Sequence, residues 1–149
     1  YFRDPEQTKN SFRDGWFMTG DLVKLDADGY YHFISRKKDI IRRRGENIAG
    51  AEIDRVVQSH PAVYEVAAVA VPSELGEDEI LVAIILKPGE KATAQEIGAW
   101  CAERLAAMKV PRYVLFVNEL PHTPTHKVAK EKLKADKTLQ SRAVDLQAK

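Results

Sequence analysis

Two short apolar runs constrain the fold of this 149-residue chain more strongly than any other feature. The runs cover residues 66–71 and 80–86, and Pro72 and the Pro88-Gly89 pair bound them. Both are far shorter than the roughly 20 residues that a membrane-spanning helix needs. Valine and isoleucine, which favour strands, are frequent in them. We therefore predict two strands of one sheet, covered on both faces or nearly so, and no membrane span.

Amphipathic helices are predicted on either side of these strands. Residues 51–59 carry apolar side chains at helical spacing, and Pro61 ends the pattern. A longer helix begins after Thr93, which forms a capping box with Glu96 three residues later. The apolar face of this second helix consists of Ile97, Trp100, Cys101, Leu105 and Met108.

The last third of the chain adds one strand and one helix. Residues 113–117 predict a third strand, and a proline-interrupted loop leads to a short basic helix near residues 129–136. The end of the chain, residues 141–149, is expected to fray.

The fold class follows from the order of these elements. Residues 1–34 carry turn signals at Asp14-Gly15 and Asp28-Gly29, which predict irregular structure that ends in a two-stranded hairpin. The strands and helices after it do not alternate regularly. We therefore predict an α+β fold, with a small sheet of about three strands and helices covering one face of it.

Charge and cysteine content exclude several classes of protein. The 23 basic and 22 acidic side chains give a net charge of +1, which argues against a nucleic-acid binder that uses a whole basic face. Cys101 is the single cysteine, so no intramolecular disulfide can form. We expect a cytoplasmic protein. The chain starts at Tyr1 without an initiator methionine or a signal peptide, so we expect a fragment of a longer protein.

The first motif that indicates chemistry is Thr19-Gly20-Asp21, which precedes the aromatic-rich residues 28–33. On its own, this tripeptide is a common turn. With two later motifs in residues 35–53 and 120–130, it resembles the adenylate-forming superfamily of acyl-CoA synthetases, adenylation domains and luciferases. The resemblance implies that Asp21 binds the ribose hydroxyls of a nucleotide. A carboxylate has two acceptor oxygens for two adjacent hydroxyl donors.

The second motif, residues 35–53, resembles the hinge motif of that superfamily. The resemblance implies that Arg36 contacts the ribose or a phosphate, that Lys38 is the hinge, and that Gly45 lines the tunnel for the pantetheine arm of CoA. A guanidinium presents fixed donors to phosphate oxygens, and a glycine lets the backbone approach a thin ligand. Ser35 stands where the family usually has glycine.

An arginine cluster at residues 42–44 lies inside this motif. Such a cluster is suited to phosphate groups, and we assign Arg42 and Arg44 to the CoA tunnel. Solvation at the surface is the alternative for each arginine. The alternative for residues 36–44 together is a solvated charge run or a contact strip for nucleic acid.

The third motif, residues 120–130, resembles the C-terminal motif of the superfamily, a proline-led loop before a short basic helix. The resemblance implies that Lys127 is the catalytic lysine of the adenylation step. A compact ammonium suits the charge that develops between a substrate carboxylate and the α-phosphate. His126 occupies the usual glycine position, which affects the geometry of the loop. Pro124 argues against a helical metal pair of His122 and His126, so no metal site is predicted.

The resemblance implies a domain division and an activity. Residues 1–36 correspond to the tail of a large N-terminal adenylation domain, and residues 37–149 to a mobile C-terminal domain. The expected enzyme is an ATP-dependent acid:CoA ligase that forms acyl-AMP and then acyl-CoA. It uses ATP, CoA, a carboxylic acid and Mg²⁺, whose ligand is expected in the missing N-terminal domain. The isolated fragment is expected to be inactive. Its motifs look most like those of crotonobetaine/carnitine-CoA ligases or fatty acyl-CoA ligases.

Two alternatives remain open at this stage. An amino-acid or aryl adenylation domain that loads a carrier protein shares all three motifs. A small nucleic-acid-binding module would use residues 36–44 as its contact strip, but it leaves Asp21 and Lys127 without a role.

Overall fold

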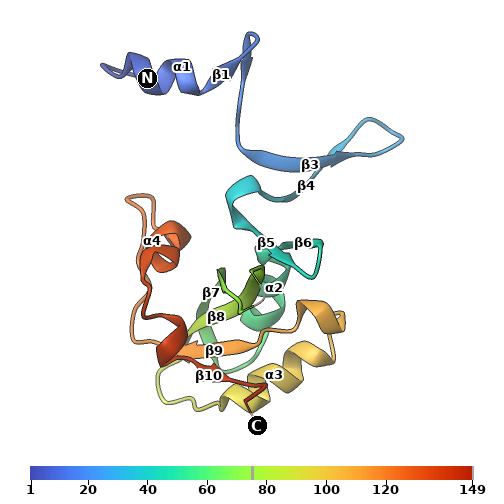
Figure 1. Cartoon of the computed structure of the whole chain (residues 1–149), viewed down its shortest axis with the longest axis vertical. Helices are drawn as coiled ribbons and strands as arrows, with labels where there is room; N and C mark the ends of the chain where they lie inside the picture. Colours follow the sequence, from blue (N-terminus) through green and yellow to red (C-terminus); the bar gives the residue numbers. More distant parts are fainter. Residues whose placement is uncertain (75, 149) are drawn as a thin grey trace. The chain divides into compact units, whose positions relative to one another are not determined.

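The computed structural model describes residues 1–74 and 76–148. The chain forms two compact units, residues 1–38 and residues 39–149 (Figure 1). Helices and strands occur in both units, and the predicted α+β class is confirmed.

The first unit contains one short helix and two hairpins. Helix α1 (Pro5–Asn10) is capped by the side chain of Asp4, and it precedes strands β1 (Phe12–Arg13) and β2 (Trp16–Phe17). Strands β3 (Asp21–Leu25) and β4 (Tyr31–Arg36) pair antiparallel, which confirms the predicted hairpin.

A third hairpin and a helix open the second unit. Strands β5 (Ile40–Arg43) and β6 (Glu46–Ala49) pair antiparallel with Arg43 opposite Glu46. The two residues of the turn, Arg44 and Gly45, both have positive φ, at 51° and 77°. This is the geometry of a tight two-residue hairpin turn, which fits the right-handed twist of the strands. Helix α2 (Gly50–Gln58) follows at once.

A four-stranded sheet forms the centre of the second unit, in the order β10-β9-β8-β7. Strands β7 (Val63–Pro72) and β8 (Asp78–Leu86) are antiparallel, and they confirm the two strands predicted from the apolar runs. Helix α3 (Ala94–Ala102) crosses over to β9 (Tyr113–Phe116), which is parallel to β8. The structure also confirms the predicted capping box at the start of α3.

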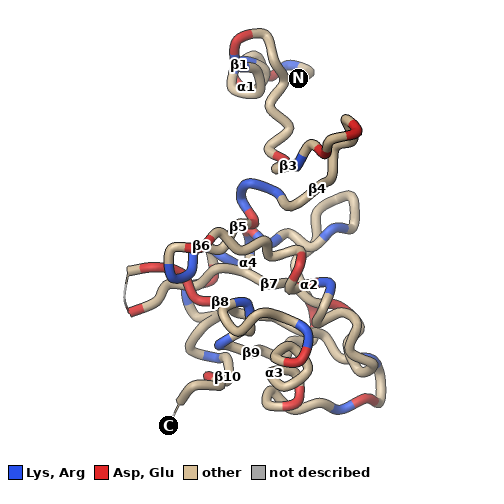
Figure 2. Tube along the Cα trace, turned by 90° about the vertical axis from the view of Figure 1, so that its right-hand side faces the viewer, with Lys and Arg blue, Asp and Glu red and all other residues tan. Residues whose placement is uncertain are grey.

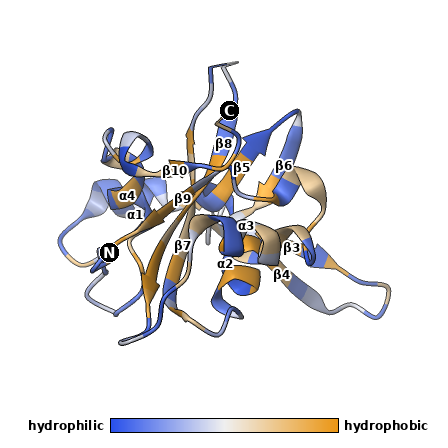
Figure 3. Ribbon diagram, turned by 90° about the horizontal axis from the view of Figure 1, so that it is seen from below, coloured by the Kyte–Doolittle hydropathy of each residue, from blue (hydrophilic) through white to orange (hydrophobic). Residues whose placement is uncertain are grey.

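Helices cover both faces of this sheet, so the prediction that they cover one face is wrong. Helices α2 and α3 pack on one face through Ile53, Val57 and Ile97. Helix α4 (Lys130–Ala135) packs on the other face through Leu133. The reason is that β7, β8 and β9 carry apolar side chains on both sides. Figure 3 colours much of these strands orange, for hydrophobic residues. A strand that is apolar on both sides needs cover on both sides.

Residues 140–145 form a 3-10 turn and a paired strand, although residues 141–149 were expected to fray; residue 149 lies outside the described residues. Strand β10 (Val144–Asp145) pairs antiparallel with β9, so the sheet has four strands rather than about three. The carboxylate of Asp145 pairs with Arg112 at 2.8 Å. A Cβ on Gly98 of α3 would come within 2.7 Å of Leu146, so this glycine makes room for the leucine.

Helix α3 is shorter than the predicted apolar face. It ends at Ala102, and Leu105 and Met108 lie beyond it, with Met108 in one of the short 3-10 turns of the described residues. These turns are Lys37–Asp39, Ala107–Lys109 and Gln140–Arg142. Cys101 of α3 is buried, and its burial raises the pKa of the thiol to about 11. Across residues 1–74 and 76–148, every helix is too short or too polar to cross a membrane.

Candidate functional site

The two predicted nucleotide contacts lie side by side in the first unit. The register of the β3–β4 hairpin places Asp21 opposite Arg36. Arg36 Nε lies 2.9 Å from Asp21 Oδ1, and the arginine side chain remains 60% exposed. The motifs predicted the two roles separately, and their spacing does not indicate this pair. The cross-strand register that creates it depends on the turn and on a bulge after Leu22.

The predicted hinge lies where the chain passes from one unit to the next. Lys38 is the last residue of the first unit and the middle residue of the 3-10 turn Lys37–Asp39. A change of backbone dihedrals at this place would alter the path between two units that are each compact. The role of Lys38 as a hinge stays a prediction.

The three residues predicted for the CoA tunnel gather at the tip of the β5–β6 hairpin. Arg42 and Gly45 line a cleft of about 390 Å³ together with Gly76, Glu77 and Asp78. Figure 2 shows the basic residues of the tip beside acidic residues of the β7–β8 loop. The Arg42 backbone N–H donates to Asp78 Oδ2 at 3.0 Å.

At the tip, hydrogen bonds fix the backbone of the turn, whereas its arginine side chains extend into solvent. The Arg44 backbone N–H donates to the carboxylate of Glu77. The side chains of Arg42 and Arg44 are exposed. Their guanidinium groups are therefore available to a ligand, whereas the cleft beside them is partly acidic.

Arg43, the remaining arginine of the cluster, has a different role. It is neither solvated at the surface nor available to a phosphate group. Arg43 is 3% exposed, and its Nε lies 2.8 Å from Glu79 Oε2. Its Nη1 donates to the backbone oxygens of Met108 and Val110 at 2.8 and 3.0 Å. Alternation along β5 sends Arg43 inward, on the same side as Ile41, while its neighbours point outward. Arg43 thus attaches the base of the hairpin tip to the core.

We predict that Arg43→Ala destabilises the protein strongly. The substitution leaves Glu79 and two carbonyl oxygens without a partner in a buried place, which costs about 3–5 kcal/mol of unfolding free energy. Urea unfolding followed by circular dichroism measures this loss. The matched control is Arg42→Ala on the exposed face of the same strand, which should change the free energy by about 0.5 kcal/mol or less. Equal losses in the two variants would contradict the anchoring role.

The predicted catalytic lysine lies on a closed loop, residues 121–129, which we call the lysine loop. Thr123 N–H donates to Lys127 O at 2.8 Å, and Ala129 N–H donates to Pro121 O at 2.7 Å. His126 N–H donates to Thr123 O at 2.9 Å and closes a turn.

His126 explains how this loop tolerates the absence of the usual glycine. Its φ is +59°, a left-handed conformation that glycine adopts freely and histidine adopts at some cost. The loop therefore has the backbone shape that a glycine would allow. Lys127 is exposed, and within residues 1–74 and 76–148 its ammonium makes no ion pair. An ammonium in this state is available to an anionic group outside the described chain.

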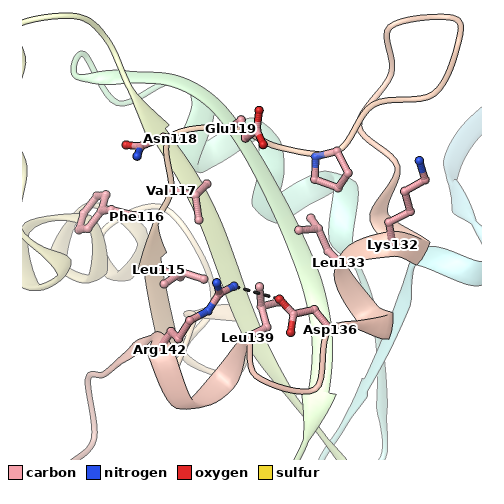
Figure 4. Close-up of a pocket in the computed structure, with 11 residues that line it drawn as sticks. Leu115, Phe116, Val117, Asn118, Glu119, Lys132, Leu133, Asp136, Leu139 and Arg142 are labelled. Atoms are coloured by element: carbon pink, nitrogen blue, oxygen red, sulfur yellow. Dashed lines mark hydrogen bonds and ion pairs between the residues drawn. The ribbon is translucent and has the colours of Figure 1, made fainter.

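A larger cavity of about 790 Å³ lies on the α4 face of the sheet (Figure 4). Its floor is formed by Leu115, Leu133 and Leu139, and an ion pair between Asp136 and Arg142, 3.0 Å long, crosses one side. None of the predicted site residues lines this cavity. Over the part of the chain that the structure describes, no three His, Cys, Asp or Glu side chains gather in a way that could hold a metal ion.

Comparison with known proteins gives the family. The AMP-binding enzyme C-terminal domain matches residues 52–127, which is more than half of the chain. The chain belongs to this family. The matched range contains helix α2 from Glu52 onward, the strands β7, β8 and β9, and the lysine loop up to Lys127.

Relatives and solved structures agree with the family. The medium-chain acyl-CoA ligase ACSF2 of Danio rerio is 42% identical over 135 residues, which is 90% of this chain and 22% of that protein. ATP-bound MatB from Rhodopseudomonas palustris superimposes with a TM-score of 0.79 at 34% identity, over 91% of this chain and 27% of that one. The amide bond synthetase McbA from Marinactinospora thermotolerans gives a TM-score of 0.77 at 32% identity, over 91% of this chain and 28% of that one.

These comparisons match this chain to a small part of larger enzymes. The chain spans 22% of the Danio rerio relative and about a quarter of the solved structures. The comparisons therefore show the family, and the activity of a longer protein is a matter for proposal.

Proposed function

We propose that this chain is the C-terminal part of an ATP-dependent acid:CoA ligase that forms acyl-AMP and then acyl-CoA. The observation that carries the proposal is the family match, which ends at an exposed lysine on a closed, well-defined loop. The relative from Danio rerio is named as an acyl-CoA ligase, and one solved neighbour holds ATP. The substrates are ATP with Mg²⁺, a carboxylic acid and CoA. The cytoplasmic location stays a prediction.

The exposed apolar surface of the first unit is evidence for a large N-terminal domain in the same longer chain. Of residues 1–38, which are all described, only Ser11 and Ser35 are buried. A unit this small that leaves its aromatic side chains exposed buries too little apolar surface to be stable alone. The exposed apolar side chains of this unit include Phe2, Phe12, Trp16, Phe17, Leu22, Leu25, Tyr31 and Phe33. We infer that they pack against the N-terminal domain of the longer enzyme.

The two half-reactions use different parts of the second unit. In the first, a carboxylate oxygen of the acid attacks the α-phosphate of ATP and pyrophosphate leaves. The Lys127 ammonium stabilises the negative charge that develops there. In the second, the CoA thiol attacks the acyl carbonyl and AMP leaves. Gly45 then faces the pantetheine arm, and Arg42 and Arg44 reach its phosphate groups. A rotation at Lys38 exchanges the two parts.

The direct test is an assay of the longer enzyme with a panel of carboxylic acids. Acid-dependent exchange of labelled pyrophosphate into ATP, followed by CoA-dependent release of AMP, is the expected result. If no acid supports exchange and the protein is folded, the proposal is wrong.

We predict that Lys38→Pro separates the two half-reactions. Proline fixes φ near −65°, so the second unit should be held in one orientation. One half-reaction should persist while the other is lost, in a protein whose circular dichroism is unchanged. Pyrophosphate exchange measures the first step, and thioester formation from preformed acyl-AMP measures the second. Equal loss of both steps in a folded protein would count against the hinge.

The second candidate function is transfer of the acyl group to an amine instead of the CoA thiol, and a specific observation favours it. The solved neighbour McbA is an amide bond synthetase, and the cleft beside Gly45 is lined by Glu77 and Asp78. Carboxylates suit an amine better than they suit phosphates. A carrier-protein pantetheine is a further possible acceptor. Supplying preformed acyl-AMP with CoA, with a pantetheine-loaded carrier or with a primary amine distinguishes the three.

A further inference from the structure

A half-buried ion pair connects the lysine loop to the rest of the second unit. Lys130 is the first residue of α4, three positions after Lys127, and its Nζ lies 2.5 Å from Asp54 Oδ2 on α2. The Lys130 side chain is 13% exposed and that of Asp54 is 25% exposed. The other oxygen of Asp54 accepts a hydrogen bond of 2.6 Å from the Ala68 backbone N–H on β7. Asp54 therefore connects a helix, a strand and the end of the lysine loop.

The ammonium of Lys130 lies over the first turn of α2, at a place where a side chain is missing. A Cβ added to Gly50 would lie 3.5 Å from Lys130 Nζ and 3.0 Å from the backbone oxygen of Asp39. Asp39 is the first residue of the second unit, directly after the predicted hinge. The lysine side chain thus ends close to the segment on which the second unit would rotate.

The positive charge of Lys130 compensates for the burial of the Asp54 carboxylate. Burial raises the pKa of Asp54 above its usual value, and the nearby Lys130 ammonium opposes that rise. Without the ammonium, the carboxylate would be left half-buried with one backbone donor. The pair is therefore unlike an exposed ion pair, which contributes little.

The other end of the lysine loop has its own anchor. His122 Nε2 lies 2.9 Å from Glu65 Oε1 on β7. His122 also forms an isolated β-bridge with Val128 across the base of the loop. Both ends of the loop are therefore attached to the scaffold of α2 and β7, while the tip that carries Lys127 is exposed.

We propose that Asp54 and Lys130 are positioning residues for adenylation, because they fix the lysine loop to the helix that follows the hinge. The proposal rests on the proposed role of Lys127. When the second unit rotates, the pair makes the loop and α2 move as one body, and Lys127 arrives at the α-phosphate in a defined place. A shift of about 1 Å in a catalytic group can cost on the order of 100-fold in rate.

Asp54→Asn in the longer enzyme is the first test. Asparagine keeps the acceptor for Ala68 but loses the negative charge that holds Lys130. The kcat of pyrophosphate exchange should fall at least ~10-fold with little change in the KM for ATP, while thioester formation from preformed acyl-AMP stays within ~2-fold. Lys130→Met should give the same pattern, and the double variant should be no worse than either single variant. Lys130→Arg should restore part of the exchange rate.

The matched control is Glu52→Gln. Glu52 lies on the same helix and forms an ion pair of 2.8 Å with Lys109, which lies in the 3-10 turn Ala107–Lys109, outside the lysine loop. This variant should leave the ratio of the two half-reactions unchanged. Amide hydrogen exchange provides a second measurement, because residues 121–129 should exchange faster in Asp54→Asn and at the normal rate in Glu52→Gln.

The outcomes separate this proposal from the one on which it rests. If Lys127→Ala abolishes pyrophosphate exchange but Asp54→Asn and Lys130→Met leave it unchanged, the positioning role is wrong and the role of Lys127 stands. If the Asp54 and Lys130 variants slow both half-reactions equally and unfold at lower temperature, the pair only stabilises the fold. If Lys127→Ala has no effect on exchange, the role of Lys127 on which this proposal rests is wrong, and the ligase activity itself is judged by whether any acid supports exchange.

Discussion

Lys127→Ala in the longer enzyme should lower the rate of pyrophosphate release at least ~100-fold, while thioester formation from preformed acyl-AMP survives largely intact. Lys127 is exposed at the tip of a loop that is closed by backbone hydrogen bonds. The substitution therefore removes a charge without disturbing the fold. In the proposed mechanism that charge is needed mainly in the transition state of the first step, so the first step alone should suffer.

The matched control for this variant is Lys132→Ala. Lys132 is a second exposed lysine, on helix α4 directly after the lysine loop. Its loss changes the net charge by the same amount but should leave both half-reactions within ~2-fold. If Lys127→Ala slowed both half-reactions equally, or left the first unaffected, the catalytic assignment would fail.

Gly45→Leu should abolish the CoA-dependent step while acyl-AMP formation continues. Gly45 lines the cleft at the hairpin tip, and a Cβ there would meet no atom of the described chain within 4 Å. A leucine side chain would therefore extend into open space, where the proposed pantetheine arm passes. The cost to stability comes only from the positive φ of 77°, which a side chain accepts at about 1–2 kcal/mol.

Gly45→Ala separates the tunnel from the turn. Alanine introduces the same backbone strain as leucine but only a methyl group, so both variants should unfold at similar temperatures. We expect Gly45→Ala to keep much of its CoA-dependent turnover and Gly45→Leu to lose it. Normal thioester formation in a folded Gly45→Leu enzyme would exclude the tunnel role. Equal losses of activity and stability in both variants would leave Gly45 with a role in the turn alone.

The central elements could be predicted because their signals are local. The two apolar runs predicted β7 and β8, and the Thr93 and Glu96 pair predicted the start of α3. The same runs also indicate how the sheet is covered. Strands that are apolar on both sides require helices on both sides, which is what α4 provides.

The features that could not be predicted depend on long-range contacts. A two-residue strand such as β10 has no periodicity, and its pairing with β9 arises from Val144 meeting Val114 across the fold. The inward direction of Arg43 did have a signal, because it lies two residues after Ile41 on the same side of β5. Its partner Glu79 could not be found without the sheet.

In the candidate site too, the residues could be predicted from local motifs, whereas their long-range contacts could not. Motif resemblance located Asp21, Arg36 and Lys127 in the sequence, and the structure shows the pair that Asp21 forms with Arg36 and the closed loop that carries Lys127. The contact between Asp21 and Arg36 and the pair of Asp54 with Lys130 join residues from different elements. Spacing along the chain does not encode such contacts, because they depend on the register and packing of the elements.

The pairing of β10 with β9 also protects an edge of the sheet. Without residues 144–146, the hydrogen-bonding groups of β9 would face solvent beside the apolar side chains of Val114 and Leu115. An exposed, apolar strand edge is a template for pairing with a second molecule. The short strand β10 thus contributes to keeping the domain from self-association, a property that would matter for the proposed rotation of the domain at Lys38.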